Sequence, residues 1–111
     1  MKSKTDIIPE DIKNCPVYRT LEIFQGKWTA WVLFELSKNE TMRFGELRNA
    51  IPNISNTMLT STLKDLEERK LVERIQYNEI PPRVEYTATE KAKSLRIVFE
   101  AMAEWGENYN Q

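Results

Sequence analysis

The sequence has no histidine and only one cysteine, Cys15, among its 111 residues. Without an imidazole, the chain holds no histidine general base, no Ser-His or Cys-His nucleophile pair and no histidine-bound metal. A single cysteine forms neither an intrachain disulfide nor a thiolate metal cluster. We therefore expect no metal site, no other cofactor and no catalysis of these kinds.

Long apolar runs are also missing. The longest stretch, near 28–34, is far shorter than the ~18 residues that a membrane-spanning helix needs. The first six residues lack the apolar core of a signal peptide. Both observations predict a cytoplasmic protein with no membrane partner.

An excess of charge of either sign is absent as well. The chain has 16 Lys and Arg residues against 17 Asp and Glu residues, for a net charge of −1. Such a chain does not coat nucleic acid non-specifically, since that binding depends on many cationic contacts to phosphate. The length and the 41% hydrophobic share predict one compact domain over 1–111. Because a core of this size has little stability to spare, we also expect oligomerisation.

What is present is a series of helices and one β-hairpin. Apolar residues recur at helical spacing, Pro16 suits the first turn of a helix, and Gly26 suits the cap after its end. Ser55 and Thr89 are placed to cap later helices. The predicted elements are a flexible lead-in over 1–11, helices over 16–26, 28–38, 44–51, 55–69 and 89–109, a short extended segment over 41–43, and a hairpin over 71–87 with a stiff tip at 78–82.

This order of elements predicts the fold class. Two short helices joined by a tight turn and followed by a β-hairpin form a winged helix-turn-helix. We therefore expect a mainly α domain with a small β-hairpin. The helix over 55–69 is the expected recognition helix, and the hairpin over 71–87 is the expected wing.

The helix over 55–69 carries the most specific chemical signal. Leu59, Leu63 and Leu66 form one apolar stripe, so the opposite face presents short polar side chains and one cation. Such groups hydrogen-bond to base edges in the major groove of DNA, where Asn pairs with adenine and Thr or Ser serve several bases. The residues expected to face the bases are Asn56, Thr57, Thr60, Ser61 and Lys64.

Carboxylates are missing from the surrounding segment. None of the acidic residues lies in the eighteen positions over 47–64, where about three are expected from the average, as a surface approaching polyanionic DNA requires. Arg83, beside the hairpin tip, is also placed to enter the minor groove. A solvated polar face with scattered charge is the alternative interpretation. The residues expected to contact the DNA backbone are Arg43, Arg48, Ser55 and Arg83.

A series of short motifs runs from Cys15 to Trp105, and each is weak alone. In this order and at this spacing they resemble the HxlR-type family of winged-helix transcription regulators, relatives of the MarR group. The motifs are Cys15-Pro16-Val17, Gly26-Lys27-Trp28, Met42-Arg43-Phe44-Gly45-Glu46-Leu47, Ile54-Ser55, Met58-Leu59-Thr60, Leu63, Leu66-Glu67, Leu71-Val72-Glu73-Arg74, Pro81-Pro82-Arg83-Val84-Glu85-Tyr86-Thr87 and Trp105.

The resemblance implies a dimeric DNA-binding regulator that reads DNA with the helix over 55–69. It also implies that Lys27 and Trp28 lie near the DNA backbone or brace that helix, with a core position for Trp28 equally open. Two residues depart from the family pattern. Thr57 stands where many members have a basic residue, and Lys70 replaces a usual helix-ending glycine, which requires a left-handed residue or a different helix end.

The first and last helices carry more apolar surface than one small domain needs. An exposed stripe of that size marks an interface, so we expect a two-fold dimer through the N- and C-terminal helices. Its recognition helices then lie ~34 Å apart, on a palindromic site. The alternative is that the stripe is core beneath the N-terminal residues. The expected interface residues are Leu21, Phe24, Leu95, Val98, Phe99, Met102, Trp105 and Tyr109.

Cys15 lies just ahead of Pro16, at the positive end of a helix dipole, which favours the thiolate. Several HxlR-type members respond to quinones, aldehydes or oxidants through a cysteine at this position, so the resemblance implies a candidate sensor. With one thiol per chain, the available reactions are alkylation, a mixed disulfide, or a bridge between two subunits. The alternative is a small buried residue at a helix start.

We therefore expect a sequence-specific transcriptional regulator, a repressor, whose partners are a double-stranded DNA operator and a second copy of the chain. Winged helices also bind proteins, so a protein-interaction module without DNA binding is the alternative. An enzyme is disfavoured because no nucleophile–base pair or phosphate loop accompanies the acids that could be invoked. Those acids are Glu22, Glu35, Glu46 and Glu85.

Overall fold

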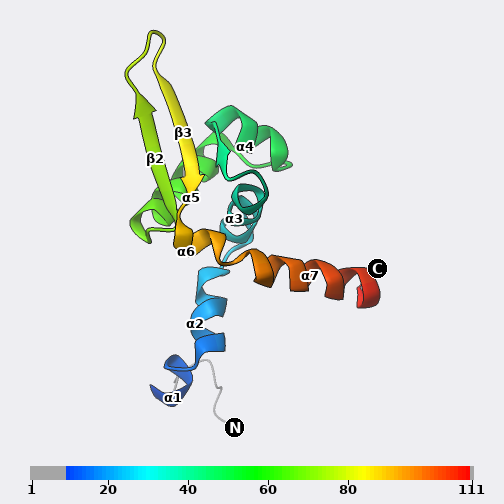
Figure 1. Ribbon diagram of the computed structural model, residues 1–111. Helices are drawn as coiled ribbons and strands as arrows, with labels where there is room; N and C mark the ends of the chain where they lie inside the picture. The colour runs from blue at the N-terminus through cyan, green and yellow to red at the C-terminus, as the bar shows by residue number, and fades with distance from the viewer. Residues whose placement is uncertain (1–9, 111) are drawn as a thin grey trace.

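The computed structural model describes residues 10–110 as a helical body, a long β-hairpin and two helices that extend from the body (Figure 1). The order of elements confirms the predicted winged helix-turn-helix, with α4 and α5 as the helix pair and β2–β3 as the wing. In chain order the elements are α1 (Glu10–Lys13), α2 (Pro16–Ile23), α3 (Lys27–Asn39), β1 (Thr41–Met42), α4 (Phe44–Ala50), α5 (Asn56–Glu68), β2 (Val72–Tyr77), β3 (Arg83–Ala88), α6 (Glu90–Lys93) and α7 (Arg96–Tyr109).

The core is built around α3, which is apolar on most of its circumference. Val32 and Leu36 of this helix are fully buried, as are Leu47 of α4 and Leu59 of α5. Full burial of a side chain of this size contributes about 1.5–3 kcal/mol relative to its exposed state. The packing of α4 and α5 against α3 therefore fixes the orientation of α5, the predicted recognition helix.

A tight turn joins α4 to α5. The Glu46 carboxylate accepts a hydrogen bond from the Arg43 backbone N–H at 2.7 Å and caps the start of α4. Pro52 ends this helix soon after its last turn, and Asn53 then adopts φ +67°. Asparagine tolerates this left-handed conformation better than most residues other than glycine. The chain thereby reverses direction within a few residues before α5 begins.

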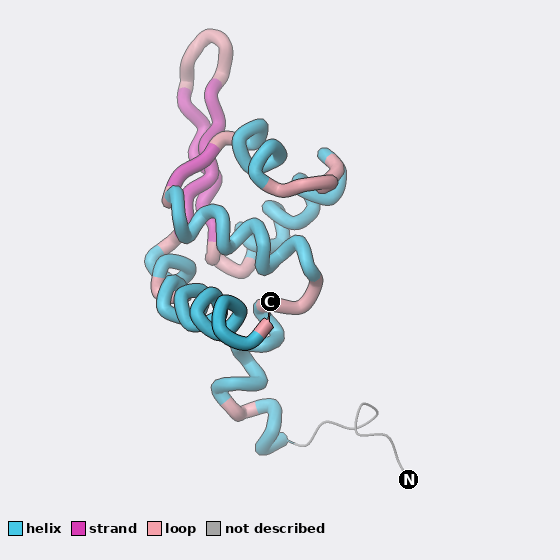
Figure 2. The backbone as a smooth tube through the Cα atoms, turned by 90° about the vertical axis from the view of Figure 1, so that its right-hand side faces the viewer, coloured by secondary structure: helices cyan, strands magenta, loops and turns pink. Residues whose placement is uncertain are grey.

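The sheet has three antiparallel strands in the order β1-β3-β2. In β1, Thr41 pairs with Thr87 of β3, and their hydroxyl oxygens lie 2.8 Å apart. The hairpin register ends with Tyr77 opposite Arg83. The hairpin and α2 project from opposite ends of the molecule (Figures 1 and 2). No helix within residues 10–110 is long and apolar enough to cross a bilayer.

Two predicted boundaries near the N-terminus are corrected by the structure. Residues 10 and 11 belong to α1, so the predicted flexible lead-in over 1–11 is too long; residues 1–9 lie outside the described part. Gly26 does not cap the preceding helix, because α2 already ends at Ile23. Instead, Gly26 precedes the first residue of α3 and adopts φ +82°, a conformation that favours glycine.

The predicted helix over 89–109 is two helices, α6 and α7. Between them, the Leu95 backbone N–H donates to the Ala92 carbonyl and the Val98 N–H donates to the Leu95 carbonyl. Each of these hydrogen bonds joins residues three positions apart, as in a 3₁₀-helix. They tighten the chain and interrupt the α-helical pattern, in which the bonded residues are four positions apart. The break allows Ala92 and Leu95 to be buried together, at 3% and 9% exposure.

The sequence predicts either a left-handed Lys70 or a different end for α5, and the structure shows the left-handed residue. This residue has φ +62°, the left-handed conformation. Its backbone N–H donates to the Glu67 carbonyl, and the Leu71 N–H donates to the Leu66 carbonyl at 2.9 Å. This is the Schellman pattern that usually carries a glycine. The Thr89 hydroxyl donates to the Lys70 carbonyl at 2.8 Å and fixes this turn against the start of α6.

Candidate nucleic-acid interface

The exposed face of α5 is set by the leucines on its other side. Leu59 and Leu66 are fully buried and Leu63 is nearly so, which holds this stripe against the core. The helix begins after Ser55, whose Oγ accepts a hydrogen bond from the Met58 backbone N–H at 3.0 Å. The opposite side of α5 therefore points away from the body.

The structure brings all five predicted base-facing residues together on this side of α5. Each side chain is exposed, and the five line one shallow, open groove. Four of them make no side-chain hydrogen bond or ion pair within residues 10–110, so their donors and acceptors remain available; Asn56 is the exception. The five residues are Asn56, Thr57, Thr60, Ser61 and Lys64.

A hydrogen bond between the two helices of the pair orients Asn56. Arg48 of α4 donates from Nη1 to Asn56 Oδ1 at 3.2 Å. Sequence reasoning placed Arg48 at the DNA backbone and did not predict this contact. Because a carbonyl oxygen has two lone pairs, Asn56 Oδ1 retains one acceptor site, and the amide NH₂ remains available as a donor. Arg48 thus fixes the direction in which the Asn56 amide points.

The groove changes charge toward the C-terminal end of α5. Asp65 and Glu68 line this end, and Asp65 Oδ2 lies 3.2 Å from Arg69 Nε. The segment over 47–64 contains no carboxylate. An anionic ligand is therefore tolerated over the first part of α5 and repelled at its end.

On the wing, Arg83 is turned back onto the hairpin instead of extending from it. Its guanidinium carbon lies 3.9 Å from the centre of the Tyr77 ring, and Nη2 lies 3.1 Å from Glu79 Oε2. Its Nε is buried and has no hydrogen-bond partner among the described residues. Arg83 is therefore not a free cation in this conformation. The sequence alone predicts an arginine that is free to contact DNA.

Sequence reasoning also missed the other side chains around Arg83. A hydrogen bond with the Glu85 carboxylate, together with its negative charge, raises the pKa of Tyr77 above its ordinary value. Glu79 is at the tip of the hairpin, and Tyr77 faces Arg83 across the two strands. The pairing register of the two strands would have predicted this cluster. It places Tyr77 opposite Arg83, and alternate residues of paired strands share one face.

The remaining predicted backbone contacts lie in two places. Arg43 is exposed at the N-cap position of α4, at the end of this helix that does not lead into α5. Lys27 lines a groove between α3 and α7, and its Nζ lies 4.5 Å from the centre of the Trp28 ring. Trp28 is partly buried and packs against the core, its ring stacked on that of Trp31 at 6.4 Å. For Trp28 the structure therefore favours the core position that the sequence left open.

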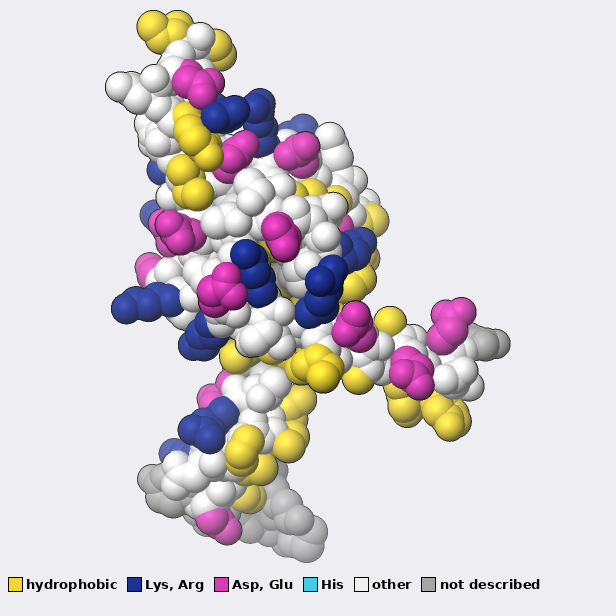
Figure 3. All heavy atoms as spheres, in the orientation of Figure 1, with side chains coloured by type: hydrophobic (Ala, Val, Ile, Leu, Met, Phe, Trp, Pro, Cys, Tyr) yellow, Lys and Arg dark blue, Asp and Glu magenta, His cyan; other side chains and the backbone are white. Residues whose placement is uncertain are grey.

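The predicted dimer-interface residues divide into two groups. Four of them are more than half exposed and follow α2 and α7 where these leave the body; Figure 3 shows hydrophobic side chains gathered along both helices. These four are Leu21, Met102, Trp105 and Tyr109. Val17 and Ile97, which were not predicted, are 66% and 73% exposed on the same two helices.

The other group belongs wholly or partly to the core of the single chain. Leu95 and Phe99 are buried at 9% and 7% exposure, so their assignment to an interface is wrong. The centre of the Phe99 ring lies 5.4 Å from that of Phe34 of α3 and 5.6 Å from that of Phe24, the residue that follows α2, which explains its burial. Phe24 and Val98 are partly buried against the same core.

Cys15 is a free, partly buried cysteine immediately before α2. Its backbone occupies the N-cap position, with a carbonyl that accepts from the Arg19 N–H at 3.1 Å. Its thiol makes no capping hydrogen bond. The side chain is therefore neither locked into the cap nor fully enclosed.

Comparison with known proteins decides the family. The sequence model of the HxlR-like helix-turn-helix family matches residues 23–111. The chain belongs to this family. The match includes all of α3 to α7 and the wing, so the resemblance that the motifs indicated is confirmed for the HxlR-like fold.

The HxlR-like chain is also similar to individual proteins. An uncharacterized HTH-type transcriptional regulator of Bacillus subtilis, YdeP, is 39% identical over 104 residues, which cover 94% of this chain and 80% of YdeP. A MarR-family transcriptional regulator from Porphyromonas gingivalis matches with a TM-score of 0.79 and 37% identity, over 93% of this chain and 97% of that one. The redox regulator HypR in its oxidized form matches with a TM-score of 0.77 and 37% identity, over 87% of this chain and 99% of the HypR chain.

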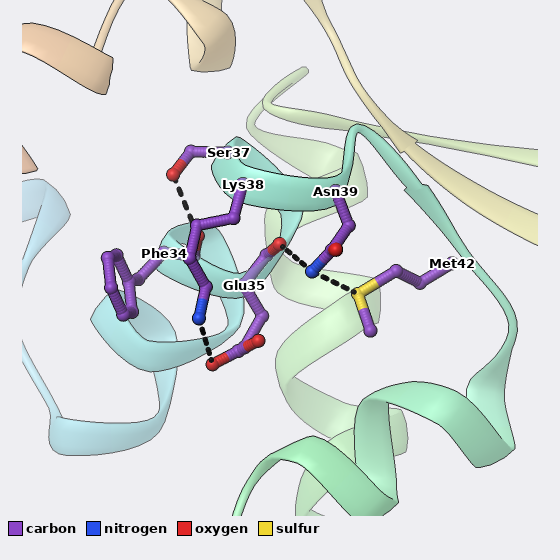
Figure 4. Close-up of polar contacts among 6 residues, drawn as sticks. All are labelled: Phe34, Glu35, Ser37, Lys38, Asn39 and Met42. Atoms are coloured by element: carbon purple, nitrogen blue, oxygen red, sulfur yellow. Dashed lines mark hydrogen bonds and ion pairs between the residues drawn. The ribbon is translucent and has the colours of Figure 1, made fainter.

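In this HxlR-like protein, three of the acids weighed for catalysis make structural contacts. Figure 4 shows buried Glu35 of α3, whose Oε2 lies 3.3 Å from Lys38 Nζ and whose backbone carbonyl accepts from Asn39 Nδ2 at 3.0 Å. Glu46 caps α4, and Glu85 lies close enough to Tyr77 that its negative charge raises the pKa of the tyrosine. These carboxylates hold helix ends and the hairpin in place.

Proposed function

We propose that this HxlR-like protein is a sequence-specific DNA-binding transcriptional regulator of the cytoplasm, formed as one DNA-binding domain over residues 1–111. In this proposal α5 lies in the major groove, and the β2–β3 hairpin lies over the adjacent minor groove. The observation that carries it is the exposed face of α5, which presents unpaired hydroxyl groups, an amide and an ammonium group with no carboxylate over 47–64.

The chemistry of this face matches that of base edges. The Asn56 amide has a donor and a free acceptor site, the pair that recognises adenine. Thr57, Thr60 and Ser61 each donate and accept through a hydroxyl group, which suits several bases. Lys64 follows toward the end of the face as a phosphate or guanine contact. The backbone N–H groups that follow Ser55 face a DNA phosphate at the start of the helix.

We further propose that the regulator is a homodimer and a repressor. The exposed apolar side chains of α2 and α7 support self-association, because a patch of this kind on a small soluble chain marks an interface. A two-fold dimer places its recognition helices ~34 Å apart, so the operator is an approximate palindrome. Linked half-sites also give a nearly neutral chain the affinity that its net charge does not supply.

Selection of bound sequences from a random DNA pool tests the proposal. The parent protein is expected to select one palindromic site, and its binding should weaken steeply with added salt. Asn56→Ala and Thr60→Ala should relax the preference at the bases that they read, by about 1–3 kcal/mol where a bidentate pair of hydrogen bonds is removed. Asn108→Ala removes the same chemical group from exposed α7 and should leave the preference unchanged.

Two outcomes contradict this assignment. If Asn56→Ala and Thr60→Ala proteins select the same site as the parent with the same stringency, α5 is not the reading helix. If the parent protein retards no DNA at low salt, the winged helix is a protein-interaction module instead.

The cysteine supports a second role, sensing of electrophiles or oxidants. The similarity to the redox regulator HypR and the partial burial of an uncapped thiol at Cys15 favour this role. With a quinone, the thiol sulfur forms a bond to the electrophilic ring carbon and the thiol proton passes to the adduct, so no external oxidant is needed. Treatment with a quinone should raise the mass of the parent protein by one quinone per chain and change its affinity for the operator. The Cys15→Ser protein should show neither change.

A further inference from the structure

The wing carries a charged cluster that does not fit a simple phosphate contact. It consists of one cation, Arg83, with Glu79 at the hairpin tip and Glu85 two residues further along β3. Tyr77 lies beneath the guanidinium. One positive and two negative charges make this part of the hairpin net acidic, which opposes an approach to DNA.

The local backbone holds Glu79 in reach of Arg83. The Glu79 backbone N–H donates to the Tyr77 carbonyl at 2.9 Å, which turns the chain at the end of β2. Pro81 and Pro82 restrict the rest of the tip, because each proline ring fixes its own backbone φ. Tyr77 and Arg83 form the last pair of the hairpin register. The chain turns after Tyr77, and this turn brings the Glu79 carboxylate to Arg83 at the start of the other strand.

Arg83 is held in place although one of its hydrogen-bond donors has no acceptor among the described residues. Its Nη2 pairs with Glu79, whereas its buried Nε has no acceptor within the described residues. The two side chains of the pair are 32% and 50% exposed, and ion pairs in contact with water contribute little to stability. A phosphate offers stronger charge-assisted hydrogen bonds to a guanidinium than an exposed carboxylate does. The pair is therefore one that DNA can open.

We propose that Glu79 is an internal competitor for the DNA phosphate that Arg83 binds, so that this carboxylate limits how tightly the wing holds DNA. The inference rests on the proposed function and goes beyond it by assigning a negative role to one residue. On DNA, Arg83 leaves Glu79 and turns to the phosphate backbone. Because the ion pair with Glu79 must break first, binding through the wing is weaker than Arg83 alone allows.

A double-mutant cycle tests this competition directly. DNA affinity is measured by fluorescence anisotropy at several salt concentrations, on the selected site and on mixed-sequence DNA, for the parent, Glu79→Gln, Arg83→Ala and the double variant. Glu79→Gln should bind both DNAs about two- to fivefold more tightly, and the gain should shrink as added salt screens the ion pair. In the Arg83→Ala background the same substitution should change affinity by less than about 1.5-fold, since nothing is left to release.

Glu73→Gln is the matched control. Glu73 lies on β2 at the base of the same hairpin, opposite Thr87, and its substitution removes the same charge away from the Arg83 cluster. It should leave affinity within about 1.5-fold of the parent. Circular dichroism of each variant checks that the fold is retained, and Arg83→Gln repeats the cycle with a side chain that still covers the Tyr77 ring.

The outcomes separate this inference from the function on which it rests. An equal gain from Glu79→Gln with and without Arg83 means simple repulsion of DNA and overturns the competition. No gain in either background overturns it as well. If none of the proteins binds DNA, the proposed function itself fails and the inference falls with it.

Discussion

At the scale of single residues, the contact between Arg48 and Asn56 links two roles that sequence reasoning kept apart. An amide that reads adenine must present its oxygen and nitrogen in a fixed order, and the hydrogen bond from Arg48 sets that order. A cation that orients a base-reading side chain affects sequence preference. A cation that only meets phosphate affects all sequences alike. Arg48 and Arg43, both on the helix-turn-helix, therefore differ in a measurable way.

Arg48→Ala should relax the preference at the base read by Asn56 as well as weaken binding, because the amide loses its fixed orientation. Arg43→Ala, the control on the same helix pair, should weaken binding to all sequences without changing the preference. Affinities for the selected site and for single-base variants of it measure both effects. The Asn56-specific part of the change should be about 1–3 kcal/mol. Equal behaviour of the two variants would show that Arg48 contacts phosphate only.

At the scale of elements, the end of α5 is held in a conformation that its sequence does not favour. Lys70 occupies the left-handed position of a Schellman turn, where a Cβ is unfavourable and a glycine is usual. The turn is retained because the bonds of Lys70 and Leu71 to α5 and of Thr89 to the Lys70 carbonyl are all made there. Tertiary contacts thus compensate for a local backbone strain.

Lys70→Gly should raise the free energy of unfolding by about 0.5–1 kcal/mol, because glycine adopts positive φ without a steric penalty. Urea denaturation followed by circular dichroism measures the change. Arg69→Gly is the neighbouring control: Arg69 has φ −79° in the right-handed region, so glycine there should lower stability by a similar amount. A loss of stability from both variants would mean that the Lys70 side chain contributes more than its backbone strain takes away.

Sequence patterns predicted the elements to very different degrees. For α5 the cap at Ser55 and the leucine spacing are local signals, and the predicted helix over 55–69 differs from α5 by one residue at each end. The separation of α6 from α7 has no local signal, since no proline or glycine lies at 94–95. It follows from the burial of Leu95 within the core. Regular periodicity predicts a helix but not a break that packing imposes.

At the scale of the whole molecule, α2 and α7 extend from a body that does not cover them (Figure 1). Trp105 and Tyr109 stack on each other at 5.8 Å near the end of α7, 58% and 75% exposed. Phe99, on the same helix, is buried between α2 and α3. The two parts of α7 therefore differ: the first belongs to the core of the chain, and the second is exposed, where the proposed dimer would form.

Trp105→Ala should weaken self-association about 30-fold or more, as expected for a buried aromatic residue at an interface, while the fold is retained. Phe99→Ala should instead lower the free energy of unfolding by about 3–5 kcal/mol, since it leaves a cavity in the core. Sedimentation velocity over a range of concentrations and thermal unfolding separate the two effects. Glu104→Ala, beside Trp105 on the exposed helix, is the control and should change neither. Unchanged self-association of Trp105→Ala would contradict a dimer formed through α7.

The sequence by itself determined the winged helix-turn-helix and the face of α5 that meets solvent, because helix caps, apolar spacing and hairpin signals act over a few residues. Only the tertiary structure decided that Arg48 orients Asn56, that Phe99 is core, and that Arg83 is held by Glu79 over Tyr77. Each of these depends on how helix packing or strand register brings separate side chains together. Spacing along a chain predicts which way a residue faces within its own element, whereas the partner that it finds there is set by the neighbouring element.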